Sequence, residues 1–310
     1  MFPSLVEFKP YIVTGLALGG VYGLSGVGMV VLYRATGVLN LAFGAIGAMG
    51  ALISWTLIHH TAVPDWASYL LCVVFGGLVT LAYGVVFGPP LARRDPLVKA
   101  TGTLGLTLVL LGLMSYLWPP FGRTMLLPTS TTAYSYHIGF ADVDVTLTQI
   151  IGLSFGVLVT LCVGAFLRYT KLGTAMRAMA DDREITATLG VPVRRVEAAA
   201  WLGSGLLAGA AGLLLSDLVG LDPVNLTFLI ISSLAAALIA RLQSLALTLV
   251  AGMAVGLATA LLTPITGWPS EANYQFSLSS YRGAAPFVIA IVTLLVLARR
   301  RVVTISRTEG

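Results

Sequence analysis

Charged side chains are scarce in this chain of 310 residues. Asp, Glu, Lys and Arg together make up 10% of it, while hydrophobic residues make up 57%. A typical soluble domain carries about 25% charged residues. So few charges cannot cover a water-facing surface, which excludes a soluble globular enzyme and predicts a polytopic membrane protein.

Cysteine is scarce as well, and its placement argues against metal or disulfide chemistry. Cys72 and Cys162 both lie inside apolar runs, so we expect two reduced packing residues. His59 and His60 are adjacent and lack further ligands at a metal-binding spacing. The sequence therefore predicts no metal site, and we find no catalytic constellation either.

Intervals without Asp, Glu, Lys or Arg define the candidate membrane spans, each of which needs about 20 apolar residues. There are nine such intervals: 10–33, 35–64, 66–92, 100–122, 145–167, 198–216, 223–240, 242–270 and 283–298. All must be helical, because an isolated strand cannot satisfy its backbone in lipid. We predict an all-α transmembrane bundle of eight or nine spans in one domain over 1–310. Whether 35–64 is a full span or partly re-entrant stays open.

The distribution of basic residues orients the spans, since cytoplasmic loops are enriched in Lys and Arg. If the 168–197 loop is cytoplasmic and nine spans alternate, fifteen basic residues lie inside and three outside. The three outer ones are Lys9, Arg123 and Arg282. This strong bias predicts an external N-terminus and a cytoplasmic C-terminus. With eight spans, the N-terminus would change sides. The net charge of +5 thus reflects topology, and we expect no nucleic-acid partner.

The polar loop 168–197 stands out between long apolar segments, with ten charged residues. We predict one helix from Thr174 to Leu189, ended by Gly190 at the C′ position. Its apolar residues form a stripe that suits insertion into a groove on a soluble partner. The alternative is a helix lying on the lipid surface, which the acidic pair Asp181 and Asp182 disfavours.

A second unusual stretch surrounds Asn40, an amide close to glycines before an apolar run. Discontinuous helices line substrate paths in transporters, because non-helical backbone at membrane depth is tolerated only against protein or water. Alternatively, Asn40 is simply the N-cap of a helix. The first interpretation predicts a substrate path formed by Asn40, Leu41, Phe43, Gly44 and Gly47.

Glycine spacing and strand-like alternation give further structural expectations. Gly15, Gly19 and Gly23 lie four residues apart and form a smooth groove on one helix face. Gly205, Gly209 and Gly212 predict that their helix packs centrally. The alternation from Tyr134 to Val145 is compatible with a small hairpin.

No acidic or basic residue lies in the middle of a predicted span, although ion-driven carriers usually need one. We also find no phosphate-binding loop for a nucleotide. The energy source is therefore expected outside this chain. Three alternatives remain open: a stand-alone channel or secondary carrier, a membrane-embedded enzyme, and a non-catalytic assembly subunit.

Three groups of residues follow the pattern of a known family in their order and spacing. The N-terminal residues are Gly15-Leu16, Leu18-Gly19, Tyr22, Leu24, Gly28, Leu32-Tyr33, Thr36-Gly37-Val38 and Asn40. Those of the central loop are Gly173, Ala175, Met176, Arg177, Ala178, Ala180, Asp182, Gly190 and Val191. Together with Tyr281-Arg282, they make the chain resemble the permease subunits of ABC importers for branched-chain amino acids.

The resemblance implies a pore formed with a second, similar permease subunit in a bacterial inner membrane. Two cytoplasmic ATPases would dock on the central loop, and an external solute-binding protein would deliver the substrate. The chain itself would bind no cofactor, since ATP would be used by the partner subunits. The resemblance implies that ATPase coupling involves Gly173, Met176, Arg177, Ala178, Asp181, Asp182 and Gly190.

Two departures from the family pattern concern the substrate and one turn. After Asn40, this chain has Leu41, Phe43 and Ala45 where the pattern has Phe, His and an acidic residue. A more apolar lining suits a leucine-like or aromatic side chain, whereas related members handle urea and short amides. The glycine-rich turn expected between the seventh and eighth spans is replaced by Ala240–Ser244.

Overall fold

The structure is a computed structural model that describes residues 5–92, 94–118, 127, 135–138, 143–263, 284–293 and 295. The helices are α1 Leu5–Thr36, α2 Phe43–His60, α3 Asp65–Leu91, α4 Pro96–Leu117, α5 Leu147–Tyr169, α6 Lys171–Asp181, α7 Arg183–Thr188, α8 Val193–Val219, α9 Pro223–Phe228, α10 Ile230–Ile239 and α11 Leu245–Leu261. Residues 285–293 are also helical. The predicted helical bundle is thus confirmed.

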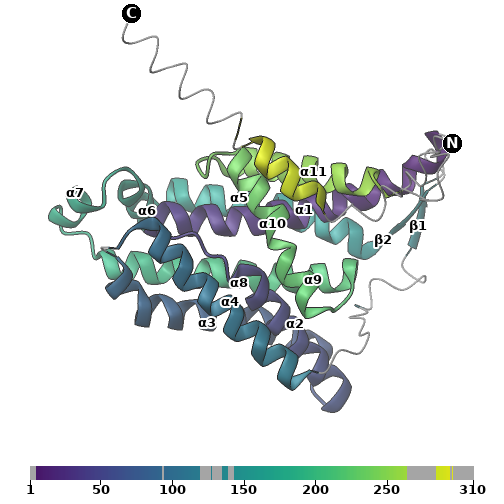
Figure 1. Cartoon of the computed structure of the whole chain (residues 1–310), viewed down its shortest axis with the longest axis horizontal. Helices are drawn as coiled ribbons and strands as arrows, with labels where there is room; N and C mark the ends of the chain where they lie inside the picture. The colour runs from purple at the N-terminus through teal and green to yellow at the C-terminus, as the bar shows by residue number, and fades with distance from the viewer. Residues whose placement is uncertain are drawn as a thin grey trace, which may run out of the picture.

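The long helices run roughly along one axis of an elongated molecule (Figure 1). The short helices α6 and α7 lie at one end. The N-terminus lies at the other end, close to a hairpin of β1 Ser135–Ile138 and β2 Val143–Thr146. The two strands are antiparallel, with Tyr136 opposite Val145, which confirms the hairpin predicted from alternation.

Five helices of the described residues are long and apolar enough to cross a membrane. They comprise Phe8–Thr36, Asp65–Leu91, Pro96–Leu117, Leu147–Tyr169 and Val193–Val219. Shorter apolar helices cover Pro223–Ile239 and Leu245–Leu261, and α2 has 18 residues. The ninth predicted span, 283–298, lies only partly within the described residues. The C-terminus, which was predicted to be cytoplasmic, lies outside them.

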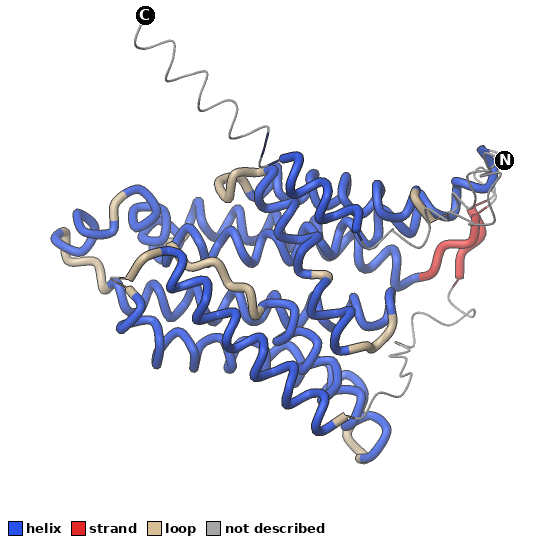
Figure 2. Tube along the Cα trace, viewed as in Figure 1, coloured by secondary structure: helices blue, strands red, loops and turns tan. Residues whose placement is uncertain are grey.

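The second predicted span is only partly helical. Residues 38–40 have no regular structure, and α2 begins at Phe43. Figure 2 shows this loop running inward from the end of α1 to the middle of the bundle. From there α2 returns the chain to the end where the N-terminus lies (Figure 1). The loop and α2 together therefore make one crossing of the bundle.

Glycine lets α1 and α11 approach each other closely, as the predicted groove requires. A methyl group added at Gly19 would lie 2.5 Å from the Cα of Met253, and one at Gly15 would lie 2.9 Å from the Cα of Leu257. On the facing helix, a methyl group at Gly252 would overlap the backbone of Gly23. The backbones of the two helices thus pack directly against each other. Lipid provides no hydrophobic effect between helices, so such dispersion contacts stabilise their association instead.

The glycines of α8 place this helix at the centre of the bundle, as predicted. Gly205 packs against the backbone of Gly76 in α3, and Gly212 packs against that of Gly47 in α2. Gly209 approaches Cys72, whose Sγ donates a hydrogen bond to the Gly209 carbonyl at 3.4 Å. The helices α2, α3 and α8 therefore form one closely packed group.

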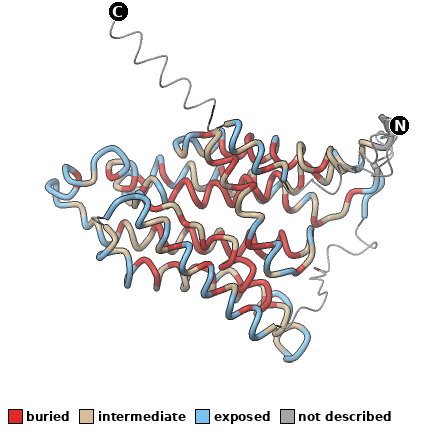
Figure 3. Tube along the Cα trace, in the orientation of Figure 1, coloured by how far each residue is buried: buried red, intermediate tan, exposed pale blue. Residues whose placement is uncertain are grey.

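Burial separates central from peripheral helices. The most apolar part of α1 is 89% buried, whereas that of α4 and of α5 is 22% buried, and Figure 3 shows buried residues gathered along the inner helices. Exposed apolar side chains on α4 and α5 match a lipid environment. They include Leu108, Val109, Leu158 and Leu161. The expectation that both cysteines are packing residues holds for buried Cys72 but is wrong for exposed Cys162.

The turn from α10 to α11 has an unfavourable backbone conformation. Arg241 and Leu242 have φ angles of 54° and 57°, in the left-handed region that favours glycine. The N–H of Arg241 donates to the Leu238 carbonyl, and that of Leu242 donates to the Ala237 carbonyl. These bonds form a Schellman motif, in which glycine is the usual C′ residue. Arg34 at the end of α1 also donates to the Gln243 carbonyl at 3.1 Å.

We expect Gly252→Leu to disrupt the bundle, because its side chain would enter the backbone of α1. Overpacking costs about 1–3 kcal/mol where neighbours can move, and here the neighbour is backbone. Thermal unfolding and size-exclusion chromatography in detergent should show a lower midpoint and less monodisperse protein. Gly105→Leu on α4 is the control, since nothing lies within 4 Å of its added Cβ. Equal behaviour of the two variants would contradict this packing.

We expect Arg241→Gly to stabilise the protein by about 1 kcal/mol, because glycine has no steric penalty at positive φ. Its thermal midpoint should exceed that of the wild type. Arg241→Ala removes the same guanidinium but keeps the Cβ, so it should give no such rise. A gain with alanine equal to that with glycine would show that the strain is not the cause.

Candidate functional site

The cytoplasmic loop predicted from charge forms a compact corner after α5. Thr170 begins α6 by accepting a hydrogen bond from the Gly173 N–H at 3.0 Å. Gly173 packs onto the end of α5, where an added methyl group would lie 2.5 Å from the Cα of Leu167. Gly173 therefore allows the sharp reversal that places α6 against α5.

The prediction of a single helix from Thr174 to Leu189 is wrong, because the helix is interrupted at Asp182. This residue is extended, with φ −152° and ψ 113°. Its carboxylate accepts hydrogen bonds from the N–H groups of Glu184 and Ile185 at 2.8 and 2.9 Å. Asp182 is thus the N-cap of α7, a role for which aspartate is strongly preferred. The apolar residues of the loop follow a helical period across Asp182, so the sequence pattern gave no sign that a new helix begins there.

The two methionines of the loop face their own chain. Met176 and Met179 are buried in a cluster with Leu32, Val38 and Val196. The expected apolar stripe is therefore not continuous on the outside, since its α6 half already has partners within the molecule. Ala178 is half-buried. Whether Met176 contributes to coupling stays a prediction, and any such contribution would pass through this cluster.

The outer surface of α6 and α7 combines charge with exposed apolar side chains. Arg177 and Asp181 are exposed, and Arg177 donates to the Arg168 carbonyl at 3.4 Å. Ile185 and Leu189 are 60% and 78% exposed and lie four residues apart. Gly190 follows at the predicted C′ position with φ +83°. We call the exposed residues Arg177, Asp181, Ile185, Leu189 and Gly190 the corner surface.

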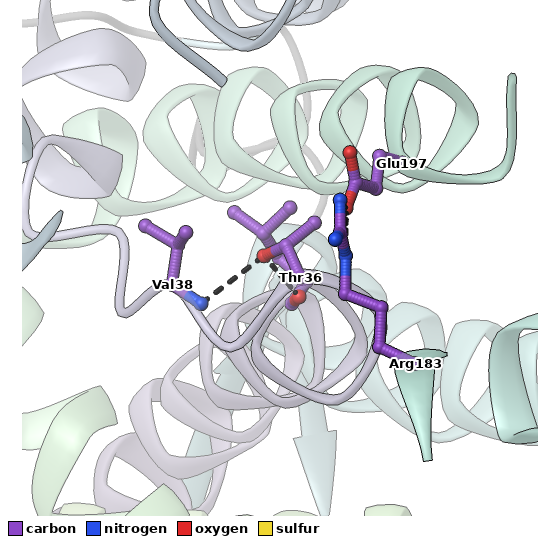
Figure 4. Close-up of polar contacts among 5 residues, drawn as sticks. Thr36, Val38, Arg183 and Glu197 are labelled. Atoms are coloured by element: carbon purple, nitrogen blue, oxygen red, sulfur yellow. Dashed lines mark hydrogen bonds and ion pairs between the residues drawn. The ribbon is translucent and has the colours of Figure 1, made fainter. Parts of the chain in front are cut away.

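An ion pair fixes α7 to the start of α8. Arg183 Nη2 lies 2.8 Å from Glu197 Oε1, and Glu197 is largely buried, with 15% of its side chain exposed. Figure 4 shows this pair together with the turn after α1, where the Val38 N–H donates to Thr36 Oγ1. Since Val38 and Val196 belong to the same cluster, the start of α8 is packed against the beginning of the non-helical segment.

The segment between α1 and α2 obtains hydrogen bonds from α4. Thr103, fully buried, accepts a hydrogen bond from the Leu41 N–H at 3.1 Å. Its hydroxyl proton has two acceptors within reach, the Leu39 carbonyl at 3.0 Å and the Ala100 carbonyl of its own helix at 2.8 Å. Irregular backbone at membrane depth needs such partners from the surrounding protein.

Asn40 combines features of both roles predicted for it. Its Oδ1 accepts from the Ala42 N–H at 3.0 Å, so the side chain caps backbone just before α2. The structure assigns Ala42 as the N-cap residue itself. Asn40 is 1% exposed, and its Nδ2 has no hydrogen-bond partner among the described residues. A buried donor without a partner is costly, so this amide is more than a local cap.

A small pocket begins at the first turn of α2. It is lined by Ser25, Phe43, Gly44, Gly47, Ala48, Ala208, Ala211, Gly212, Leu215, Leu226, Ile230 and Ser233. The cavity has a volume of about 10 Å³, roughly what one water molecule needs. The pocket is therefore closed to a larger ligand in this conformation.

The structure brings together three of the five predicted path residues, since Phe43, Gly44 and Gly47 line this pocket. Asn40 and half-buried Leu41 precede it on the non-helical segment. The sequence did not indicate Ser25 or Thr103, because no local pattern connects them with Asn40 or α2. Ser233 was expected to form a hydrogen bond between helices. Ser233 Oγ is buried without a partner among the described residues.

Comparisons with known proteins agree along nearly the whole chain. A family model for the permease component of branched-chain amino acid transport systems matches residues 11–297. The probable branched-chain amino acid transport permease protein LivH of Methanocaldococcus jannaschii is 26% identical, and the match covers 88% of this chain and 85% of the relative.

Further relatives and one solved structure are similar. The high-affinity branched-chain amino acid transport system permease protein LivH of Escherichia coli is 23% identical over 96% of each chain. LivM of Escherichia coli is 28% identical over 70% of this chain and 53% of its own length. The structure of PsaBC from Streptococcus pneumoniae in complex with Fab covers 92% of this chain and 90% of that one, with a TM-score of 0.48. Since the family model spans residues 11–297, this chain belongs to the family of branched-chain amino acid transport system permease components.

Proposed function

We propose that this chain is the transmembrane permease subunit of an ATP-driven importer for branched-chain or related apolar amino acids. It receives its substrate from an external solute-binding protein and forms a pore with a second permease subunit. Two cytoplasmic ATP-binding subunits dock on the corner surface and supply the energy. The chain lies in the bacterial inner membrane with its C-terminus in the cytoplasm.

The corner surface carries this proposal, because it is a polar, folded projection at one end of an apolar bundle (Figure 1). Its exposed Ile185 and Leu189 give a docking partner apolar contact, and its charged residues give orientation. Because Met176 and Met179 pack into a buried cluster, α6 would move together with that cluster as one rigid unit. A push on α6 acts on the cluster of Met176, Met179 and Val38, and hence on the segment that carries Asn40.

The substrate path of the proposal includes Asn40, Leu41, Phe43, Gly44 and Gly47. Gly44 is central to it, because an added methyl group would lie 2.5 Å from the Thr227 carbonyl. The start of α2 and the end of α9 therefore lie in direct contact. Separation of these two helix ends would enlarge the pocket.

Purification of the chain expressed with its neighbouring genes tests the proposal directly. We expect two ATP-binding subunits and a second permease in the complex, and ATP-dependent leucine uptake in proteoliposomes when the solute-binding protein is present. Transport by this chain alone without ATP would instead support a stand-alone carrier. A complex that assembles but transports urea and not leucine would reassign the substrate.

We expect Arg177→Glu to weaken ATPase docking by about tenfold, because charge reversal at an interface costs more than 1 kcal/mol. Co-purification yield and the salt dependence of association measure this effect. Lys9→Glu makes the same reversal at the opposite end of the molecule and should leave docking unchanged. If the Arg177→Glu variant co-purified with the ATPases as well as the wild type, Arg177 would not be part of the docking surface.

A further inference from the structure

The first turn of α2 presents hydrogen-bond donors inside the bundle. The first N–H groups of any helix have no intrahelical acceptor, and Ala42 provides no side-chain cap for α2. This end of α2 also carries the positive end of the dipole of an 18-residue helix. Most helices meet water at such an end, whereas α2 begins in the middle of the bundle (Figure 2).

Asn40 adds a donor of its own at the same place. Because its Oδ1 is bonded to the Ala42 N–H, the carboxamide lies against the start of α2 and its orientation is determined. If the amide were flipped, its Nδ2 would face the Ala42 N–H, and two hydrogen-bond donors would point at each other. The remaining Nδ2 is therefore held beside the first turn of α2, buried and without a partner among the described residues.

Donors of this kind select a particular chemical group. A carboxylate accepts several hydrogen bonds and carries the negative charge that a helix N-terminus favours. A neutral amide carbonyl accepts the same bonds without the charge and binds more weakly. Half-helix N-termini near the middle of the membrane bind substrate carboxylates in other transporter folds.

The adjoining pocket suits an apolar group attached to that carboxylate. It starts at Phe43 and Gly44, directly after the donors, and its lining is aliphatic, aromatic or backbone apart from the hydroxyls of Ser25 and Ser233. The lining contains no charged side chain. A small branched hydrocarbon therefore finds dispersion contacts there and no penalty from an unpaired charge.

We propose that Asn40 Nδ2 and the first turn of α2 form a recognition site for the carboxylate of the transported substrate, with its aliphatic side chain in the adjoining pocket. This inference rests on the proposed function and names the substrate class of its path: an apolar carboxylate, in preference to urea or a neutral amide. Separation of Gly44 from the Thr227 carbonyl opens the site during transport.

Thr103 gives the site its fixed geometry. Its hydroxyl accepts from the Leu41 N–H directly after Asn40 and lies 3.0 Å from the Leu39 carbonyl directly before it. These contacts hold the backbone on both sides of Asn40 at the start of α2. Preorganised donors of this type lose little entropy when the ligand binds.

The purified complex, with whichever subunits accompany the chain, is tested with two probes of the same shape. Sodium isovalerate offers a carboxylate on the leucine side-chain skeleton, and isovaleramide offers a neutral amide. Titration of the thermal midpoint gives the apparent affinity of each. For the wild type, we expect isovalerate to bind at least about tenfold more tightly, the effect of one charge-assisted hydrogen bond.

Asn40→Leu removes the Nδ2 donor at similar volume, so it should abolish this preference. Thr36→Val is the matched control, because it deletes one hydrogen bond to the same segment, at the Val38 N–H, and leaves Asn40 intact. Asn40→Ala replaces the leucine variant if that variant fails to assemble. A wild type without preference, or a preference retained by both Asn40 variants, overturns the inference.

The probe-binding test of the carboxylate site and the transport test of the proposed function can fail independently of each other. A complex that imports leucine with ATP but binds both probes equally refutes only the carboxylate site. A chain that purifies without ATPases and shows no ATP-dependent uptake refutes the importer. In that case an isovalerate preference lost in Asn40→Leu would still support the carboxylate site.

Discussion

Direct contact between helix backbones is the interaction on which this bundle depends. In lipid the hydrophobic effect does not press helices together, so they must gain dispersion contacts by close approach. Glycines provide that approach between α1 and α11, between α8 and α3, and between α8 and α2. Of these helices, α1, α2 and α8 also line the pocket at Gly44 and Gly47, together with α9 and α10, so part of the packing that holds the fold also borders the candidate path.

The non-helical segment before α2 gives up helical hydrogen bonds in the interior of the described bundle. The free-energy cost of these lost hydrogen bonds is limited, because Thr36, Asn40 and Thr103 supply partners for nearby peptide groups. What remains is an amide donor at the start of a helix. An arrangement that satisfies the backbone but leaves a side-chain donor free is better suited to binding than to stability.

Much of this architecture could be predicted from the sequence, because it depends on local pattern. Apolar length predicted the helices, the spacing of Gly15, Gly19 and Gly23 predicted the α1 groove, and alternation predicted the hairpin. The failures were at residues whose roles depend on backbone geometry. Asp182 was predicted to lie within one continuous helix, although it caps a new one. The contribution of Thr103 required contacts between distant segments, which no local pattern encodes.

The two candidate sites are physically continuous, and this continuity gives a structural basis for coupling. Met176 and Met179 of α6 share one hydrophobic cluster with Leu32 of α1, with Val38 of the non-helical segment and with Val196 of α8. The Arg183–Glu197 pair binds α7 to α8 next to this cluster. Interiors are packed as densely as crystals, so a movement of α6 would disturb the cluster to which Val38 belongs. Asn40 lies two residues after Val38, so this cluster is the route by which we propose that the corner surface acts on the substrate site.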